Sequence, residues 1–286
     1  MRLEDIHLCD PFVLAHEGKY YMYGTRGLER WEKEAFGLDV YVSEDLVEWS
    51  GPKEIFKRTP DFPYTMNYWA PEVYKYNNRF FMFVSFKAPD VCRGTAVLVS
   101  DAPDGMFTMH SDGPVTPKEW ECLDGTLYVA EDGTPYMVFC HEWVQTTDGQ
   151  MCVIPLTKDL KAAAGEPRLL FTASQSEWIN KPAKVYITDG PFMYRMQNGD
   201  LYMLWSASGK GGYSVGLVKS DNGDISGNWT HIKEPLFEMN GGHAMIFDTY
   251  DGRKMLSLHA PEYFPQERPR FYEVKETEEG WLTVIL

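Results

Sequence analysis

A hairpin pattern occurs five times along this chain, and this internal repeat restricts its fold more than any other feature. Each copy has a two-residue anchor, a short apolar strand, a turn, and an aromatic or Met-rich return strand. The copies are DPFVLAHEGKYYMYGT from residue 10, APEVYKYNNRFFMFVS from 70, DGTLYVAEDGTPYMVFC from 124, DGPFMYRMQNGDLYMLWS from 189 and GHAMIFDTYDGRKMLSLHA from 242. Strand-like segments joined by short polar turns predict antiparallel hairpins.

A third strand is expected between successive hairpins. It is found in GLDVYVS, TAVLVS, MCVIPLT and YSVGLVK, and a polar turn usually follows it. Three or four strands in each of five repeats, with almost no helical periodicity, predict an all-β fold, a five-bladed β-propeller. No linker divides the chain, so we expect one domain over residues 1–286. An irregular β-sandwich is the alternative.

The anchors predict where a functional site lies. A propeller places the first strand of each blade beside the central channel, so the five anchors should meet near its mouth. Three of them carry aspartate: Asp10, Asp124 and Asp189. One aspartate before proline or glycine is an ordinary turn residue, but three at one repeat position predict an acidic cluster.

The order of the blades suggests a role for each aspartate. Asp124 and Asp189 belong to neighbouring repeats, so like charge and partial burial should raise one of their pKa values and leave a protonated acid. Asp10 lies two repeats from each and should stay ionised as a base. An acid and a base separated by room for a water molecule can hydrolyse an acetal by single displacement.

At these residues the sequence resembles glycoside hydrolase family 43, over essentially the whole chain. The matching elements are Asp10-Pro11-Phe12, Trp69-Ala70-Pro71-Glu72, Asp124, Asp189-Gly190-Pro191 and His243. The resemblance implies that Asp10 is the base, that Asp124 tunes and orients the acid, and that the acid stands at position 189.

The acid of this family is usually glutamate, whereas Asp189 is one methylene shorter. Three explanations stay open: the backbone comes closer here, Glu142 in the CHEW segment serves as the acid, or catalysis has been lost.

Aromatic residues beside the anchors suggest a sugar site, because the C–H faces of sugars stack on such rings. The candidates are Phe12, Trp69, Trp143 and Trp178, and both a sugar site and the core fit the last two. Arg268 can bind a sugar hydroxyl or form a structural ion pair. The resemblance implies that His243 helps to hold a structural calcium ion, although a lone axial histidine also fits a hydrogen-bonded core.

Charge and composition exclude several partners. A formal net charge of -15 disfavours nucleic acid and anionic membrane surfaces. No apolar stretch approaches the length of a membrane span, and MRLEDIHLCDP does not read as a secretory signal. The five cysteines are scattered, so we expect reduced thiols and a cytoplasmic location. The sequence predicts no oligomeric state.

The expected function is that of an inverting, exo-acting glycosidase. The resemblance implies release of a terminal pentose, α-L-arabinofuranose or β-D-xylose, from plant-derived oligosaccharides. Long loops such as GTRGLERWEKEAFG, FKRTPDFPYTMNY and SQSEWINKPAKVY can wall the channel mouth into a pocket that favours chain-end attack. The alternatives are an endo-arabinanase of the same fold, a glycoside phosphorylase, which would need cationic groups for phosphate, and a non-catalytic carbohydrate-binding propeller.

Overall fold

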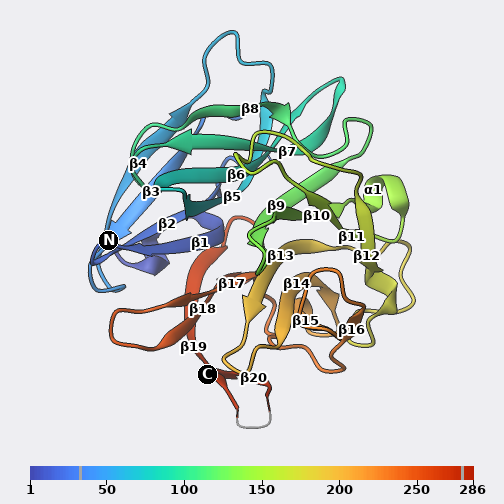
Figure 1. Ribbon diagram of the computed structural model, residues 1–286. Helices are drawn as coiled ribbons and strands as arrows, with labels where there is room; N and C mark the ends of the chain where they lie inside the picture. Colours follow the sequence, from blue (N-terminus) through green and yellow to red (C-terminus); the bar gives the residue numbers. More distant parts are fainter. Residues whose placement is uncertain (32–33, 278–279) are drawn as a thin grey trace.

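The computed structural model describes residues 1–31, 34–277 and 280–286, and it confirms the predicted five-bladed β-propeller. Five four-stranded antiparallel sheets surround a common centre (Figure 1). The first strand of each sheet lies innermost and the fourth lies at the outside. Among the described residues, no helix is long and apolar enough to cross a membrane.

Each blade is formed by four strands that follow one another in the sequence. Blade 1 contains β1 (Leu8–His16), β2 (Lys19–Arg26), β3 (Gly37–Ser43) and β4 (Trp49–Lys57); blade 2 contains β5 (Met66–Tyr76), β6 (Arg79–Ala88), β7 (Val91–Ser100) and β8 (Thr108–Pro114). Blade 3 contains β9 (Cys122–Val129), β10 (Pro135–His141), β11 (Gln150–Pro155) and β12 (Arg168–Thr172); blade 4 contains β13 (Asp189–Arg195), β14 (Leu201–Gly209), β15 (Gly212–Ser220) and β16 (Trp229–His231). Blade 5 contains β17 (Gly242–Asp248), β18 (Lys254–Ala260), β19 (Arg268–Glu276) and β20 (Leu282–Ile285). Three single turns complete the elements: η1 (Leu3–Asp5), α1 (Trp143–Thr146) and η2 (Ala173–Gln175).

The hydrophobic core lies between the blades. Each sheet is hydrophobic on both faces, because it packs against a neighbour on either side. Separate clusters of buried side chains join blade 2 to blade 3, blade 3 to blade 4, and blade 4 to blade 5. The largest cluster joins blades 1 and 2 and also includes Met245, Phe247 and Met255 of blade 5.

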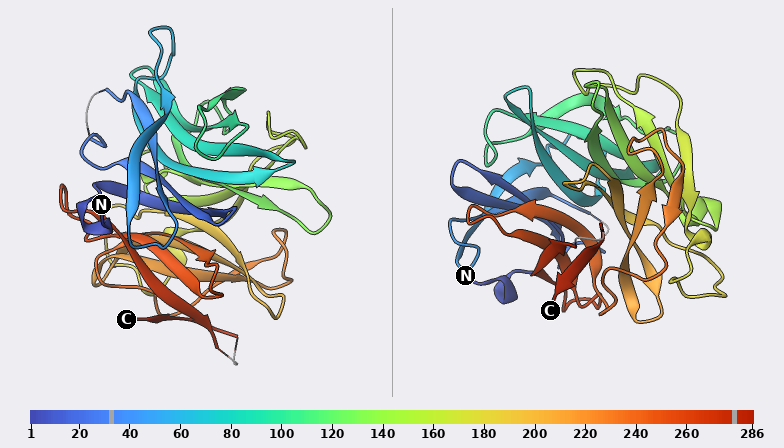
Figure 2. Two further views of the ribbon diagram at one scale, coloured as in Figure 1. Left: turned by 90° about the vertical axis from the view of Figure 1, so that its left-hand side faces the viewer. Right: turned by 60° about the horizontal axis from the view of Figure 1, so that its bottom comes forward.

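The ring closes without exchanging a strand between its ends, since blade 1 is wholly N-terminal and blade 5 wholly C-terminal. These two blades lie side by side (Figure 2). Polar contacts join them: the Ser257 hydroxyl donates to the Pro11 carbonyl at 2.8 Å, and Arg30 pairs with the buried Glu267 at 2.6 Å. Side-chain packing and polar contacts between blades 1 and 5 therefore close the ring.

Candidate active site

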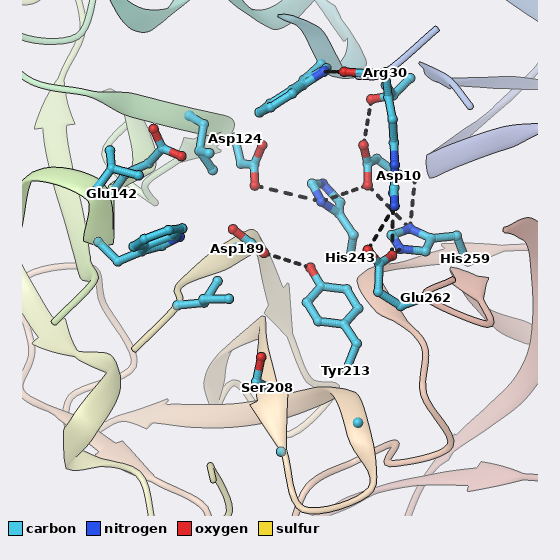
Figure 3. Close-up of a pocket in the computed structure, with 18 of the residues that line it drawn as sticks. Asp10, Arg30, Asp124, Glu142, Asp189, Ser208, Tyr213, His243, His259 and Glu262 are labelled. Atoms are coloured by element: carbon cyan, nitrogen blue, oxygen red, sulfur yellow. Dashed lines mark hydrogen bonds and ion pairs between the residues drawn. The ribbon is translucent and has the colours of Figure 1, made fainter. Parts of the chain in front are cut away.

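A cavity of about 770 Å³ lies at one mouth of the central channel (Figure 3). Every blade contributes to its wall, through residues that include Asp10, Trp69, Asp124, Asp189 and His243. The prediction that the anchors meet in one place is therefore correct. Arg30 and Trp31 reach it from the β2–β3 loop, and Asn180 reaches it from the segment before β13. The segment 56–68, which we expected in the wall, lines no part of this cavity.

An irregularity at the start of each inner strand turns these side chains toward the channel. In every blade the pairing register between the first and second strands shifts at this point. One residue in each irregularity has a positive φ angle: Asp10 (54°), Ala70 (47°), Asp124 (56°), Gly190 (50°) and His243 (54°). Such angles are uncommon outside glycine, so their recurrence marks these five residues as structurally equivalent.

This equivalence corrects one prediction from the sequence. Asp189 does not share the repeat position of Asp10 and Asp124, because Gly190 holds that position in blade 4. Asp189 pairs with Ser206 of β14, just as Cys9 pairs with Thr25 in blade 1. A side chain at position 190 would also collide with His243, since an added Cβ would lie 2.8 Å from the Cγ atom of that ring.

The equivalent backbone amides are held by a hydrogen bond that crosses between blades. The amide of Ala70 donates to the Thr25 hydroxyl at 2.8 Å. In the same way, Asp124 N–H donates to Ser85 Oγ at 3.1 Å and His243 N–H donates to Ser206 Oγ at 2.8 Å. In each case the acceptor stands near the end of the second strand of the preceding blade. These contacts fix the spacing of neighbouring site residues.

Blade 3 breaks this pattern, because Cys140 occupies the corresponding position and pairs with Leu123. The Gly190 amide donates instead to Asp124 Oδ2 at 2.9 Å. This bond joins the backbone beside Asp189 to the neighbouring acid. The two candidate acids are thereby held in a fixed relation.

Asp10 is surrounded by hydrogen-bond donors. Thr25 Oγ1 donates to Asp10 Oδ2 at 2.5 Å, while His243 Nδ1 lies 3.2 Å from Asp10 Oδ1. Burial alone would raise the pKa of Asp10, but the His243 ring, followed by the contacts from His259 and Thr25, holds it well below its usual range. Asp10 is therefore ionised at neutral pH.

His259 supports this ionised state from blade 5. Its Nδ1 atom lies 3.3 Å from Asp10 Oδ1 and 3.1 Å from the Asp10 amide nitrogen, and its Nε2 atom lies 2.5 Å from Glu262 Oε2. Burial disfavours charge on this ring, but the contacts with Asp10 and Glu262 outweigh it and raise the pKa of His259 to about 9. At neutral pH the protonated Nδ1 donates to the carboxylate; a neutral ring would accept the amide N–H instead.

Asp124 and Asp189 have the opposite character. Burial first, and the charge of Asp10 second, raise the pKa of Asp124 well above its usual range. Burial first, and the charge of Asp124 second, do the same for the pKa of Asp189. Asp189 Oδ2 also accepts a hydrogen bond from the Tyr213 hydroxyl at 3.1 Å (Figure 3). The cavity thus combines the ionised Asp10 with a coupled pair of acids, in which a charge on Asp124 makes Asp189 keep its proton.

Another part of the wall combines charge with aromatic rings. Arg93 pairs with the buried Glu142, and its guanidinium group lies 4.3 Å from the centre of the Trp69 ring. Burial raises the pKa of Glu142, although Arg93 opposes this shift. Trp69 meets the edge of Trp31, which is 61% exposed, and Trp143 also lines the cavity. Trp69, Glu142 and Trp143 therefore lie where the sequence predicted a sugar site.

Three predicted sugar contacts lie outside the cavity and are corrected here. Phe12 is buried in the channel, where its ring packs against Tyr74 and Phe192. Trp178 is a core residue between blades 3 and 4, because its indole fills the space over Gly216: an added Cβ there would lie 2.2 Å from the ring.

Arg268, the third predicted sugar contact outside the cavity, joins the N-terminal segment to blade 5. Its Nε donates to the Glu4 carbonyl at 2.8 Å, and its Nη2 lies 3.0 Å from the Nε2 atom of His7. It therefore contributes to closure of the ring.

The described residues provide no set of side-chain ligands for the calcium ion predicted near His243. Among the described residues, no group of three or more histidine, cysteine, aspartate or glutamate side chains is arranged to hold a metal ion. Calcium prefers six to eight oxygen ligands, whereas His243 offers ring nitrogens, and its Nδ1 faces Asp10 and Asp124. The calcium ion near His243 therefore stays a prediction, and the proposed mechanism uses no metal.

Several residues of the site were not predicted from the sequence. They are Thr25, Arg30, Trp31, Arg93 and Tyr213. Thr25 had a visible signal, because the quoted repeats end in small polar residues at Thr25, Ser85 and Ser206. Arg30 and Trp31 lie in the loop GTRGLERWEKEAFG, which was expected to wall the pocket, but no pattern singled out these two residues. Arg93 and Tyr213 had no signal, since each reaches the cavity from outside the five quoted hairpins.

A family model described as "Glycosyl hydrolases family 43" matches residues 6–282. The chain is 23% identical over 296 residues to an extracellular exo-alpha-(1->5)-L-arabinofuranosidase, ArbA, of Cellvibrio japonicus (strain Ueda107); the match covers 90% of this chain and 79% of that protein.

Two crystal structures are similar over nearly the whole chain. An endo-arabinase from Bacteroides thetaiotaomicron VPI-5482 matches with a TM-score of 0.89 and 36% identity, covering 98% of this chain and 99% of that chain. A thermostable family-43 glycoside hydrolase matches with a TM-score of 0.84 and 25% identity, covering 97% and 92% respectively.

Proposed function

This chain belongs to family 43 of the glycosyl hydrolases, and from that premise we propose that it is an inverting, exo-acting glycosidase. Family membership makes it an enzyme that hydrolyses O-glycosyl bonds. The proposed substrate is a short oligosaccharide, from which the enzyme removes a terminal α-L-arabinofuranose or β-D-xylose. The arrangement of Asp10 and Asp189 on one cavity, with opposite pKa shifts, is the observation that carries this proposal.

In the proposed mechanism Asp10 is the general base. It accepts a proton from a water molecule as that water attacks the anomeric carbon. Thr25 and His243 hold the carboxylate in place, and His259 maintains its charge. A base that is ionised over a wide pH range suits this step.

Asp189 is the proposed general acid. Its carboxyl group donates a proton to the glycosidic oxygen while the bond from that oxygen to the anomeric carbon breaks. Asp124 keeps the acid protonated through its charge and orients it through the bond from Gly190 N–H. Glu142 is the less suitable acid, because it is engaged by Arg93.

Chain-end attack is supported by the shape of the site. The cavity has walls from all five blades and from the β2–β3 loop, where Arg30 and Trp31 stand. A walled pocket holds one terminal sugar more readily than the middle of a polymer. The name of the C. japonicus relative, an exo-acting arabinofuranosidase, agrees with this choice.

Endo-acting hydrolysis of arabinan is the second candidate function. It is favoured by the likeness to the B. thetaiotaomicron structure, which is described as an endo-arabinase and shares 36% of its residues with this chain. A phosphorylase is less well supported. Three cationic side chains line the cavity beside the acidic cluster: Arg30, Arg93 and Lys210. Two of them are engaged by carboxylates, because Arg30 pairs with Glu262 and Glu267. Arg93 pairs with Glu142.

The products of a defined oligosaccharide test the proposal. We expect α-1,5-arabino-oligosaccharides or β-1,4-xylo-oligosaccharides, labelled at the reducing end, to be shortened by one sugar at a time with inversion at the released anomeric carbon. Shorter oligosaccharides without early monosaccharide would establish endo action instead. Dependence on added phosphate would indicate a phosphorylase. Binding without release of any sugar would favour the non-catalytic alternative.

A further inference from the structure

Tyr213 makes the one hydrogen bond that the described residues offer to the Asp189 carboxyl group. We propose that Tyr213 is a positioning residue for the acid: its hydroxyl fixes Asp189 Oδ2 as an acceptor, so that Oδ1 carries the proton delivered to the leaving group. This inference rests on the proposed function, because it assigns a role within that reaction.

The position of Tyr213 is fixed on several sides. Its ring stacks on the His259 ring, with centroids 5.6 Å apart and planes at 19°. It also lies against Gly242, where an added Cβ would come within 2.4 Å of Tyr213 Cε1. Its backbone amide donates to Asn240 Oδ1 at 3.2 Å. The hydroxyl is therefore presented to Asp189 by a ring that has little freedom to move.

The Tyr213 hydroxyl is the donor in this contact. Burial, and then the charge of Asp189, raise the pKa of Tyr213 well above its usual range, so its proton is retained at every working pH. A protonated carboxyl group has one O–H donor and one carbonyl oxygen, and the carbonyl oxygen is the better acceptor. The contact with Tyr213 therefore assigns the carbonyl role to Oδ2. The other oxygen is turned away from Tyr213, toward the side of Asp124 and Glu142 (Figure 3).

The proton transfer balances in this arrangement. The Oδ1 proton moves to the glycosidic oxygen, and the electron pair of the breaking bond stays on that oxygen. Asp189 becomes a carboxylate, and the Tyr213 O–H continues to donate to it. Because a hydrogen bond to a charged group is stronger than one to a neutral group, this contact strengthens as the proton leaves.

The short side chain of Asp189 gives Tyr213 a particular importance. A carboxyl group attached directly to Cβ reaches less far than that of glutamate, so its direction decides whether the proton meets the leaving oxygen. Among the described residues Tyr213 is the one side chain that hydrogen-bonds to Asp189, whereas Thr25, His243 and His259 all contact Asp10. Tyr213 contacts the Asp189 carboxyl group directly, whereas Asp124 orients it only through the backbone of Gly190.

The test compares two leaving groups in the Tyr213→Phe variant. On natural oligosaccharides, whose alcohol leaving groups require a proton, we expect kcat/KM to fall about tenfold or more. On a dinitrophenyl glycoside of the same sugar, which needs no proton, we expect a change of less than about twofold. The ratio of the two substrates does not depend on the folded fraction of a preparation, so it remains informative even if the variant is less stable.

Two controls complete the experiment. Tyr76→Phe removes a hydroxyl outside the cavity, which donates to the Lys158 carbonyl, and should leave both substrates unaffected. In an Asp189→Ala background, adding Tyr213→Phe should cause no further loss on a nitrophenyl glycoside, because the residue through which Tyr213 acts is gone.

The pH profile gives an independent readout. Loss of a donor to the carboxylate should raise the pKa of the acid, so the alkaline limb of kcat/KM should move to higher pH in Tyr213→Phe. The charges of Asp124, Glu142 and His243, which also act on Asp189, remain in this variant. An unmoved limb, equal losses on both leaving groups, or an additive loss in the Asp189→Ala background would each overturn the inference. A wild-type protein that hydrolyses no glycoside would instead overturn the proposed function, and this inference with it.

Discussion

At the scale of single residues, environment separates three chemically identical side chains. Asp10 has the donors Thr25, His243 and His259 around it, so its charged form is favoured. Asp124 is buried and Asp189 lies half-buried beside it, and this environment raises the pKa of both carboxyl groups. One cavity can therefore hold a base and an acid at the same pH, which is the requirement for single-displacement hydrolysis.

We expect Asp10→Asn to fold normally and to lose at least about a thousandfold in kcat on every glycoside. The amide can still accept the Thr25 hydrogen bond, but it cannot accept a proton from water. Steady-state kinetics on good and poor leaving groups measure the loss, with the exposed Asp101→Asn as the matched control. Turnover close to that of the wild type would remove Asp10 from the role of base.

We expect Asp124→Asn to move the alkaline limb of the kcat/KM profile to lower pH. The substitution keeps an acceptor for Gly190 N–H, but it removes the negative charge that raises the pKa of Asp189. A lower pKa means that the acid loses its proton at lower pH. The profile measured from pH 5 to 9 checks the direction, and a limb that stays in place would separate Asp124 from the acid.

At the scale of strands, a repeated irregularity builds the site. The register shift at the start of each inner strand turns one residue toward the channel, and a side chain from the preceding blade receives its amide. The same local structure therefore sets both the direction of the site residues and the contact between blades. It also explains why β6 and β14 each have a serine near the end of the strand, at Ser85 and Ser206.

We expect Ser85→Ala to lower the free energy of unfolding by about 1–3 kcal/mol, because the Asp124 amide would lose its acceptor in a buried position. Urea unfolding gives this value. The matched control is Ser50→Ala, which removes an exposed hydroxyl that donates to the Val42 carbonyl. Equal effects of the two substitutions would show that the contact between blades has no special importance.

At the scale of the whole molecule, the channel encloses a buried acid in addition to those of the site. Glu72 is 5% exposed, and the Tyr74 hydroxyl donates to it at 2.5 Å. Burial raises the pKa of Glu72 to about 7, although the hydrogen bonds oppose this shift. The folded protein therefore holds a proton that the unfolded chain releases above pH 4.5.

The expected cytoplasmic location of the protein stays a prediction.

This pKa shift predicts a pH dependence of stability. Because the folded state binds more protons, the contribution of Glu72 is fully present below pH 4.5 and is lost as the pH rises to about 7. We expect Glu72→Gln to match the wild type near pH 4 and to exceed its free energy of unfolding by up to about 3 kcal/mol above pH 8. Urea unfolding across this range, with the exposed Glu44→Gln as control, measures the difference. Parallel curves for variant and wild type would contradict the prediction.

The blades and the meeting of Asp10, Asp124 and Asp189 could be predicted from the amino-acid sequence alone. Hairpins are local structures, so alternating apolar residues and turns such as Asn198-Gly199 specify them within a short stretch of chain.

The three-dimensional arrangement of the blades determined which side chains face the cavity. It placed Asp189 one position before the residues equivalent to Asp10, buried Trp178 against Gly216, and brought Tyr213 to the acid. These outcomes depend on register shifts and on packing between blades whose residues are far apart in the chain. A one-residue shift in a strand reverses the direction of its side chains, and the local sequence pattern does not specify where that shift occurs.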